Sequence, residues 1–224
     1  MAQNDRIRSR EDLARLVNRY GFLPFFKNLL PGFSVEEKIE PELWFTSLPG
    51  PWEWKGPLLR EDKLIYGKFF GKRAVFMTRE FFTELANYRR DGYDFDALWD
   101  DEKASFKEKR LFDLIEQNAP VLSTELKAAG GYGKDGKTDF DATLTRLQTL
   151  CYAIPDDFVY ATDKSGKPYG WGTARFTTPE KMMGKAFTEK VYEKKPEESY
   201  RLLFTRLKAL FPEAPEKTLK RFLG

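Results

Sequence analysis

Residues 106–178 decide the fold of this chain, and they read FKEKRLFDLIEQNAPVLSTELKAAGGYGKDGKTDFDATLTRLQTLCYAIPDDFVYATDKSGKPYGWGTARFTT. Their clearest periodic signal is one apolar stripe at the spacing of an α-helix, formed by Phe140, Leu144, Leu147, Cys151 and Ile154. This stripe predicts a long helix, capped by Asp139 or Asp141 and closed by Pro155. Because Cys151 lies on the stripe, we expect its thiol to be buried and inert.

Two shorter helices precede this stripe, and two strands follow it. The first helix is predicted over residues 106–118, where a proline ends it, and the second over residues 123–130, where a glycine pair ends it. Strands are predicted at residues 158–161 and 169–176, with a polar turn between them. Three helices followed by a β-hairpin are the order of a winged helix-turn-helix module, which often binds nucleic acid.

In such a module the third helix enters the major groove of DNA, and basic side chains of the hairpin contact phosphates. The face opposite the apolar stripe is expected to contact bases through Thr145, Arg146, Thr149 and Tyr152. Basic residues in the flanking loop and the hairpin turn are expected to hold phosphates, namely Lys134, Lys137, Lys164 and Lys167.

The charge balance of this module weakens the case for DNA. Residues 105–178 contain ten Lys or Arg and ten Asp or Glu. Proteins that bind DNA well usually concentrate positive charge on the contacting face. A merely solvated face, or a face that binds another protein, therefore stays open as an interpretation.

The preceding segment, residues 1–104, is predicted to be a mixed α/β lobe rich in aromatic residues. A helix begins at Ser9 and ends at Gly21, and strands at residues 64–70 and 74–77 precede a helix capped by Thr78. Between them, residues 22–57 hold six prolines, which argue against a long regular element there.

This proline-rich segment also carries Trp44, Trp52 and Trp54, with Glu53 between the last two. Its rings are candidates to stack on a flipped or single-stranded base. In an enzymatic interpretation, Glu53 would activate water for cleavage of a glycosidic bond. The competing interpretation is that these rings fill a core that lacks regular elements.

An acidic run at residues 91–102 is taken as the boundary between the lobe and the module. It lacks the spacing of a calcium-binding loop, so we expect no metal site there. After the module, residues 179–224 carry eleven Lys or Arg and seven Asp or Glu, and they predict a basic helical segment. The expected fold is α+β, with three parts at residues 1–104, 105–178 and 179–224.

Composition excludes several chemistries. The chain of 224 residues has no His, which removes Ser-His-Asp triads and His-containing zinc sites, and one Cys cannot build a disulfide or a cysteine zinc site. We therefore expect no cofactor, no metal and no disulfide-linked partner. The single cysteine fits a cytoplasmic location. The polar N-terminus argues against a signal peptide. The sequence has no run of about 18 apolar residues, so we expect no membrane span.

Four short motifs occur together in this chain: a helix that ends in Gly-Gly, the sequence LTRLQ at residues 144–148, the YGW of the hairpin and the WEW at residues 52–54. Through these motifs residues 40–180 resemble the winged-helix group related to the bacterial alkylpurine and crosslink DNA glycosylases, the AlkZ-like proteins. The active glycosylases use a Gln-x-Gln pair, which is absent here, since the glutamines are Gln3, Gln117 and Gln148. The resemblance therefore implies the fold more than the reaction.

Three functions follow as alternatives. The first is a DNA-binding protein associated with DNA repair, without established catalysis. The second is a DNA glycosylase that places an alkylated base among the aromatic rings. The third is a ligand-sensing or protein-interaction module that does not meet DNA. The oligomeric state and the preferred DNA do not follow from the sequence.

Overall fold

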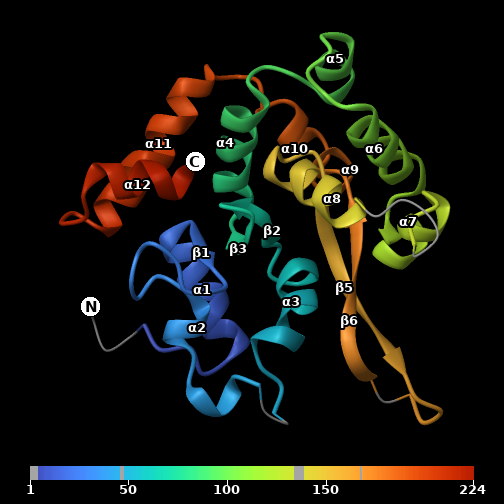
Figure 1. Ribbon diagram of the computed structural model, residues 1–224. Helices are drawn as coiled ribbons and strands as arrows, with labels where there is room; N and C mark the ends of the chain where they lie inside the picture. Colours follow the sequence, from blue (N-terminus) through green and yellow to red (C-terminus); the bar gives the residue numbers. More distant parts are fainter. Residues whose placement is uncertain (1–4, 46–47, 134–138, 167) are drawn as a thin grey trace.

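The computed structural model describes residues 5–45, 48–133, 139–166 and 168–224, and the expected α+β class is confirmed (Figure 1). The first lobe contains α1 (Arg10–Tyr20), β1 (Phe22–Pro24), α2 (Val35–Lys38), the 3-10 turn η1 (Pro41–Leu43), α3 (Pro51–Arg60), β2 (Ile65–Phe70), β3 (Arg73–Met77), α4 (Arg79–Arg90) and α5 (Phe95–Asp100). Then follow α6 (Phe106–Asn118), β4 (Val121–Leu122), α7 (Ser123–Ala129), α8 (Phe140–Thr149), β5 (Ile154–Thr162) and β6 (Pro168–Thr177). The chain ends in α9 (Pro179–Met183), α10 (Lys185–Thr188), α11 (Pro196–Leu210) and α12 (Glu216–Leu223).

Local side-chain chemistry explains where the predicted helices begin. Ser9 accepts a hydrogen bond from the amide of Asp12 at the start of α1, and Thr78 does the same for Phe81 at the start of α4. Ser105 and Glu108 form a capping box at the start of α6. Each cap satisfies backbone N–H groups that have no partner inside the helix.

The strands of the described residues form two antiparallel sheets of three strands each, in the orders β1-β3-β2 and β4-β6-β5. In the first sheet, β3 is central, because Met77 pairs with both Phe22 of β1 and Ile65 of β2. In the second sheet, β6 is central, and the hairpin β5–β6 extends away from α8 past α3 (Figure 1). The predicted order of three helices followed by a hairpin is confirmed.

The predicted third helix was too long. Helix α8 ends at Thr149, Cys151 adopts a left-handed φ of 63°, and Ile154 and Pro155 already belong to β5. The apolar stripe continues past the helix because Cys151 and Ile154 are both fully buried, against the aromatic core of the first lobe. Periodicity reports which side chains are buried, and here buried side chains follow one another through a helix and then a strand.

The proline-rich segment is more regular than the sequence suggested. It contains α3, whose Pro51 occupies the first helical position, where its fixed φ and missing N–H are tolerated. Pro57 lies inside this helix and removes one backbone hydrogen bond, but the adjacent Leu58 and Leu59 are buried. Burial of apolar side chains therefore outweighs an unfavourable local preference.

Two hydrophobic cores organise the chain. The larger one combines α1, the first sheet and α4 with the inner faces of α11 and α12, including Leu203, Leu207 and Leu219. The smaller one lies among α5, α6, α7, α8 and the second sheet, around Leu111, Ile115 and Leu147. The segment after the hairpin thus packs on the first lobe. The first part of this predicted helical segment consists of two short helices, α9 and α10.

One buried cation joins the two cores. The side chain of Arg90, at the end of α4, is 1% exposed and donates to Glu180 Oε1 of α9 at 2.6 Å and to the carbonyl of Cys151 at 2.7 Å. Its guanidinium carbon also lies 4.5 Å from the ring centre of Tyr152 and 5.1 Å from that of Phe187. A charge buried this deeply persists only when it is paired and hydrogen-bonded.

We expect Arg90→Met to lower the free energy of unfolding by about 3 kcal/mol, because it leaves a buried carbonyl without its donor and separates α4 from α9. Denaturant unfolding measures this change. Arg15→Met is the matched control, since Arg15 is 54% exposed and pairs with Asp12 on the surface of α1. Equal stability of the two variants would contradict the role given to Arg90.

Candidate functional site

The two lobes meet where α8 packs against β2, along the face of α8 that was expected to contact DNA. The backbone N–H of Lys68 donates to Gln148 Oε1 at 3.1 Å, and the Lys68 ammonium donates to Thr145 Oγ1 at 3.3 Å. The hydroxyl of Thr149 donates to the carbonyl of Lys68 at 3.1 Å. This face of α8 is therefore occupied by the protein itself.

The prediction that Thr145 and Tyr152 lie on an outward face is wrong. Thr145 is 9% exposed, and Tyr152 is 2% exposed. The hydroxyl of Tyr152 donates to the carbonyl of Tyr93 at 2.8 Å, while its ring packs on Phe95. The helical pattern correctly placed Thr145 opposite the apolar stripe, but it could not show that β2 covers this second face.

The other residues that were predicted to contact DNA are either exposed or lie outside the described residues. Arg146 is 57% exposed and forms an ion pair with Glu108 of α6 at 3.3 Å. Lys164 is exposed in the turn of the hairpin. Lys134, Lys137 and Lys167 lie outside the described residues.

The hairpin brings a second tryptophan-bearing surface to the proline-rich segment. We call Trp44, Phe45, Trp52 and Trp171 the aromatic patch. The centre of the Trp52 ring lies 5.0 Å from that of Phe45 and 5.5 Å from that of Trp171. Phe45 and Trp171 are 61% and 70% exposed. Large rings at this exposure leave apolar area in water, which is typical of a binding surface.

Trp171 was assigned only to a strand by the sequence, so its place in the patch was missed. A signal was present, because Trp171 stands between two glycines on the hairpin. Gly172 makes room for the ring of Tyr160, since a Cβ there would lie 2.9 Å from it. The Tyr160 hydroxyl then donates to the carbonyl of Trp52 at 3.1 Å, which fixes the hairpin against α3.

The predicted tryptophans are half-buried rather than fully displayed. Trp44, Trp52 and Trp54 all pack against the larger core. Trp52 joins the aromatic patch, whereas Trp54, two residues further along α3, projects to a different side of the helix. The rings thus fill a core, as the competing interpretation expected, while one edge of the tract faces water, and stacking on a base stays a prediction.

Glu53 is exposed and has a structural role. It occupies the third position of α3, where Oε2 accepts a hydrogen bond from the amide of Gly50 at 2.9 Å. A carboxylate at this position also interacts favourably with the dipole of the helix. The structure does not bring a second carboxylate into contact with Glu53 among the described residues.

The residue that sequence analysis missed is Lys55, which is 8% exposed at the contact of α3 with β5. Its ammonium nitrogen lies 4.1 Å from the ring centre of Phe158, 5.2 Å from that of Trp52 and 6.0 Å from that of Tyr66. Burial lowers the pKa of Lys55 to about 8, and the nearby charge of Glu53 opposes this shift. Loss of hydration therefore outweighs the attraction of the rings for a cation.

A cleft of about 270 Å³ opens beside Lys55, between β2, α8 and the second sheet. Tyr66 and Phe158, which flank Lys55, also line this cleft. Gln148 and Lys68 line it from the other side, and Gln148 is 4% exposed. Burial raises the pKa of the Tyr66 hydroxyl above its usual value, so this group stays a proton donor.

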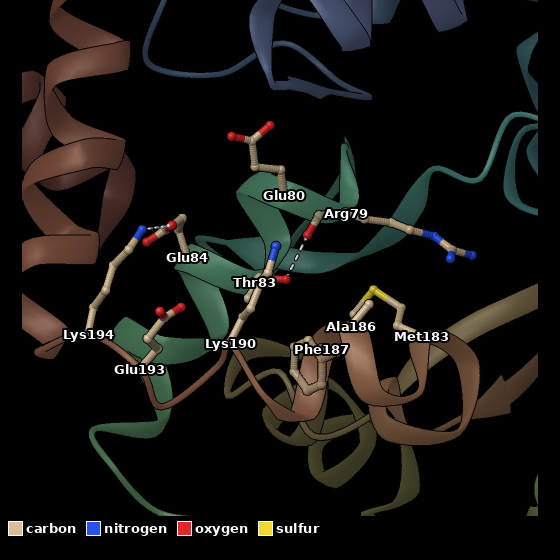
Figure 2. Close-up of a pocket in the computed structure, with 10 residues that line it drawn as sticks. All are labelled: Arg79, Glu80, Thr83, Glu84, Met183, Ala186, Phe187, Lys190, Glu193 and Lys194. Carbon is tan, nitrogen blue, oxygen red and sulfur yellow. Dashed lines mark hydrogen bonds and ion pairs between the residues drawn. The ribbon is translucent and has the colours of Figure 1, made fainter.

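A second, larger pocket of about 390 Å³ lies between α4 and the segment of α9 and α10 (Figure 2). Figure 2 shows Lys190 directed into it, while Glu84 is paired with Lys194. Glu84 also accepts a hydrogen bond from Ser199 at 2.6 Å. Its lining carries charges of both signs and points to no particular reaction.

Other chemistries find little support in the described part of the chain. It contains no cluster of three or more metal-ligating side chains. Every helix described is too short or too polar to span a membrane. Cys151 is fully buried, as expected, and burial raises the pKa of its thiol to about 12.

A model of the family described as AlkZ related matches residues 7–224. The chain belongs to the AlkZ-related family. No curated protein and no solved structure matched it. The family match extends well beyond the segment whose motifs resemble the AlkZ-like glycosylases, and it includes the C-terminal helices that complete the larger core. Within this AlkZ-related chain, Gln148 is the glutamine that lines the cleft, whereas Gln117 is exposed on α6.

We expect Lys55→Met to stabilise the AlkZ-related protein below pH 8, because it removes a buried amine that is charged there. The folded protein loses this proton near pH 8, whereas an unfolded chain holds it to about pH 10.5, so the wild type gains stability between these values. The advantage of Lys55→Met over wild type should therefore shrink by roughly 2 to 3 kcal/mol between pH 7 and pH 10.

Denaturant unfolding at each pH measures this difference. Lys72→Met is the control, because Lys72 is exposed in the turn between β2 and β3. A constant difference between Lys55→Met and wild type across this range would contradict the shifted pKa.

Proposed function

We propose that this protein is a winged-helix DNA-binding protein associated with DNA repair, and that it contacts DNA through the hairpin β5–β6 and the aromatic patch. Membership of the AlkZ-related family supports the association with repair. The order α6, β4, α7, α8, β5, β6 and the strand order β4-β6-β5 support the winged-helix assignment.

The single observation that carries the proposal is the exposure of the aromatic patch. Trp171 is 70% exposed, yet its position is fixed against Trp52 at 5.5 Å between ring centres. A rigid, exposed ring of this kind stacks on an unpaired base at a cost of little conformational entropy. Such stacking contributes about 1 to 3 kcal/mol per base and does not depend on base identity.

The proposal assigns only a few residues to phosphate contacts. In the proposal, Lys164 in the hairpin turn and Arg146 on α8 face the phosphate backbone, and Thr149 lies at the edge of that contact. Because the module as a whole is neutral, stacking supplies more of the affinity than charge does. We therefore expect a preference for single-stranded or distorted DNA over regular duplex.

We expect Trp171→Ala to weaken binding to a single-stranded oligonucleotide by about tenfold, because it removes one stacking surface. Phe106→Ala is the matched control, since Phe106 is also 70% exposed but lies at the start of α6. Fluorescence anisotropy measures both affinities. Equal losses in the two variants, or no binding by wild type at low salt, would contradict the proposed surface.

The salt dependence of binding to the same oligonucleotide tests whether Lys164 contacts a phosphate. Lys164→Ala should lower the slope of log affinity against log salt by about 0.7, the value for one phosphate on single-stranded DNA. An unchanged slope would remove Lys164 from the contact. Wild-type protein that binds no DNA at all would favour the remaining alternative, a ligand-sensing or protein-interaction module.

A second candidate function is a DNA glycosylase, and the cleft beside the patch favours it. The cleft combines the hydroxyl of Tyr66, the amide of Gln148 and the ammonium of Lys68 within about 270 Å³. In this candidate a base leaves the patch and enters the cleft, and Glu53 activates the water. Lys55, two residues after Glu53 on α3, adjoins the cleft through Tyr66 and Phe158, whose rings line it.

If this second function holds, Glu53→Gln should slow release of alkylated purines from duplex DNA about 100-fold or more, since general base catalysis is lost. The substitution keeps an oxygen that accepts the hydrogen bond of Gly50, so α3 stays capped. Melting temperature checks this. Release by wild type that survives Glu53→Gln unchanged would exclude Glu53 as the base, and no release by wild type would exclude the reaction.

A further inference from the structure

One buried nitrogen donor has no acceptor at the contact between α3 and the hairpin, and a lysine amine without an ion pair to any described residue lies over its ring. The indole N–H of Trp52 is buried and has no hydrogen-bond partner. Within the described residues, no ion pair or hydrogen bond reaches the amine of Lys55, which instead lies among three rings. Unpartnered donors of this kind are costly and call for an acceptor that arrives with a ligand.

None of the described charged groups pairs directly with the amine of Lys55, although the nearby charge of Glu53 favours its charged form. Glu53, on the same helix, is turned to the amide of Gly50. Asp157, on β5, is engaged by Arg60 and lies 3.7 Å from Arg175. The hydroxyls of Tyr66 on β2 and Tyr160 on β5 are neutral at physiological pH, since burial raises the pKa of both.

A lysine amine with no counter-ion and little water has one well-known chemical use. The neutral form is a nucleophile that adds to carbonyl carbons, and an apolar pocket increases the share of this form. The share is substantial here, because burial lowers the pKa of Lys55 to about 8. The indole N–H of Trp52, in the ring 5.2 Å from the amine, can donate to the oxygen of the same carbonyl.

We propose that Lys55 forms an imine with the C1′ aldehyde of an abasic deoxyribose in DNA. This inference rests on the proposed function, because the hairpin and the aromatic patch deliver the DNA. An abasic sugar fits the position better than an intact nucleotide does, since three rings already surround the amine and no base has to enter. The exposed rings of Phe45 and Trp171 are placed to stack on the neighbouring bases.

The step balances without a further reactant. The neutral amine of Lys55 attacks C1′ of the open-chain sugar, a new N–C bond forms, and the carbonyl oxygen takes a proton from the nitrogen. The resulting carbinolamine takes one proton from solvent and loses water, which leaves a protonated imine. Added borohydride then delivers a hydride to C1′ and converts the imine into a stable secondary amine.

Borohydride trapping with an abasic single-stranded oligonucleotide tests the proposal, with the adduct located by peptide mapping. We expect the main adduct on Lys55 and at least a tenfold lower yield for Lys55→Met. Lys72→Met is the control, because Lys72 is exposed in the turn between β2 and β3 and has no part in the proposed site, and it should keep the yield. Adducts spread over exposed lysines, or an equal yield for Lys55→Met, would overturn the proposal.

The pH dependence of trapping gives a readout that a structural role would not change. The yield at Lys55 should level off near pH 9, because its amine is then mostly neutral. The yield at an exposed lysine such as Lys72 should still rise there. A Lys55 profile that matches the exposed lysine would overturn the proposal.

Two further measurements separate this inference from the proposed function. Anisotropy with the same oligonucleotide reports binding, so wild type that binds but forms no Lys55 adduct overturns the inference alone. Free 2-deoxyribose with cyanoborohydride tests the amine without DNA. Selective labelling of Lys55 by this sugar, in a protein that does not bind DNA, supports the nucleophile and overturns the proposed function.

Discussion

The buried guanidinium of Arg90 is the interaction on which the arrangement of this protein depends. It joins the end of α4 to the turn between α8 and β5 through Cys151, and to α9 through Glu180. Cys151 and Glu180 both follow the first lobe in the sequence. This one cation therefore helps to position the start of the second sheet relative to the first sheet. Because loss of either partner would leave a charge unpaired in the interior, we expect this junction to be rigid.

That junction decides which surfaces stay available. Next to it α8 packs against β2, where Lys68 engages Gln148, Thr145 and Thr149, and the hairpin strand β5 packs along α3. A helix that would otherwise be free to enter a DNA groove becomes part of an internal contact. The hairpin also brings Trp171 to Trp52. Its Phe158 completes the group of three rings around Lys55. The candidate chemistry of the protein therefore lies at the contact of its two lobes.

Family membership and geometry bear on the proposed DNA partner in different ways. The AlkZ-related match covers nearly the whole chain, but the Gln-x-Gln pair of the active glycosylases is absent from the sequence. The structure offers a cleft with Gln148 and Tyr66, and beside it an amine without a counter-ion. A protein that recognises damaged DNA and reacts with an abasic sugar would need stacking rings and a neutral amine more than it would need that glutamine pair.

The sequence by itself determined the local elements: the caps at Ser9, Thr78 and Ser105, the order of three helices and a hairpin, and the α+β class. It also carried the family resemblance. Only the tertiary structure decided that Thr145 and Tyr152 are buried, that Trp171 joins Trp52, and that Lys55 lies among three rings without an ion pair to any described residue. The reason is physical. Caps and periodicity act between residues a few positions apart, whereas burial and pKa depend on which distant segments pack together.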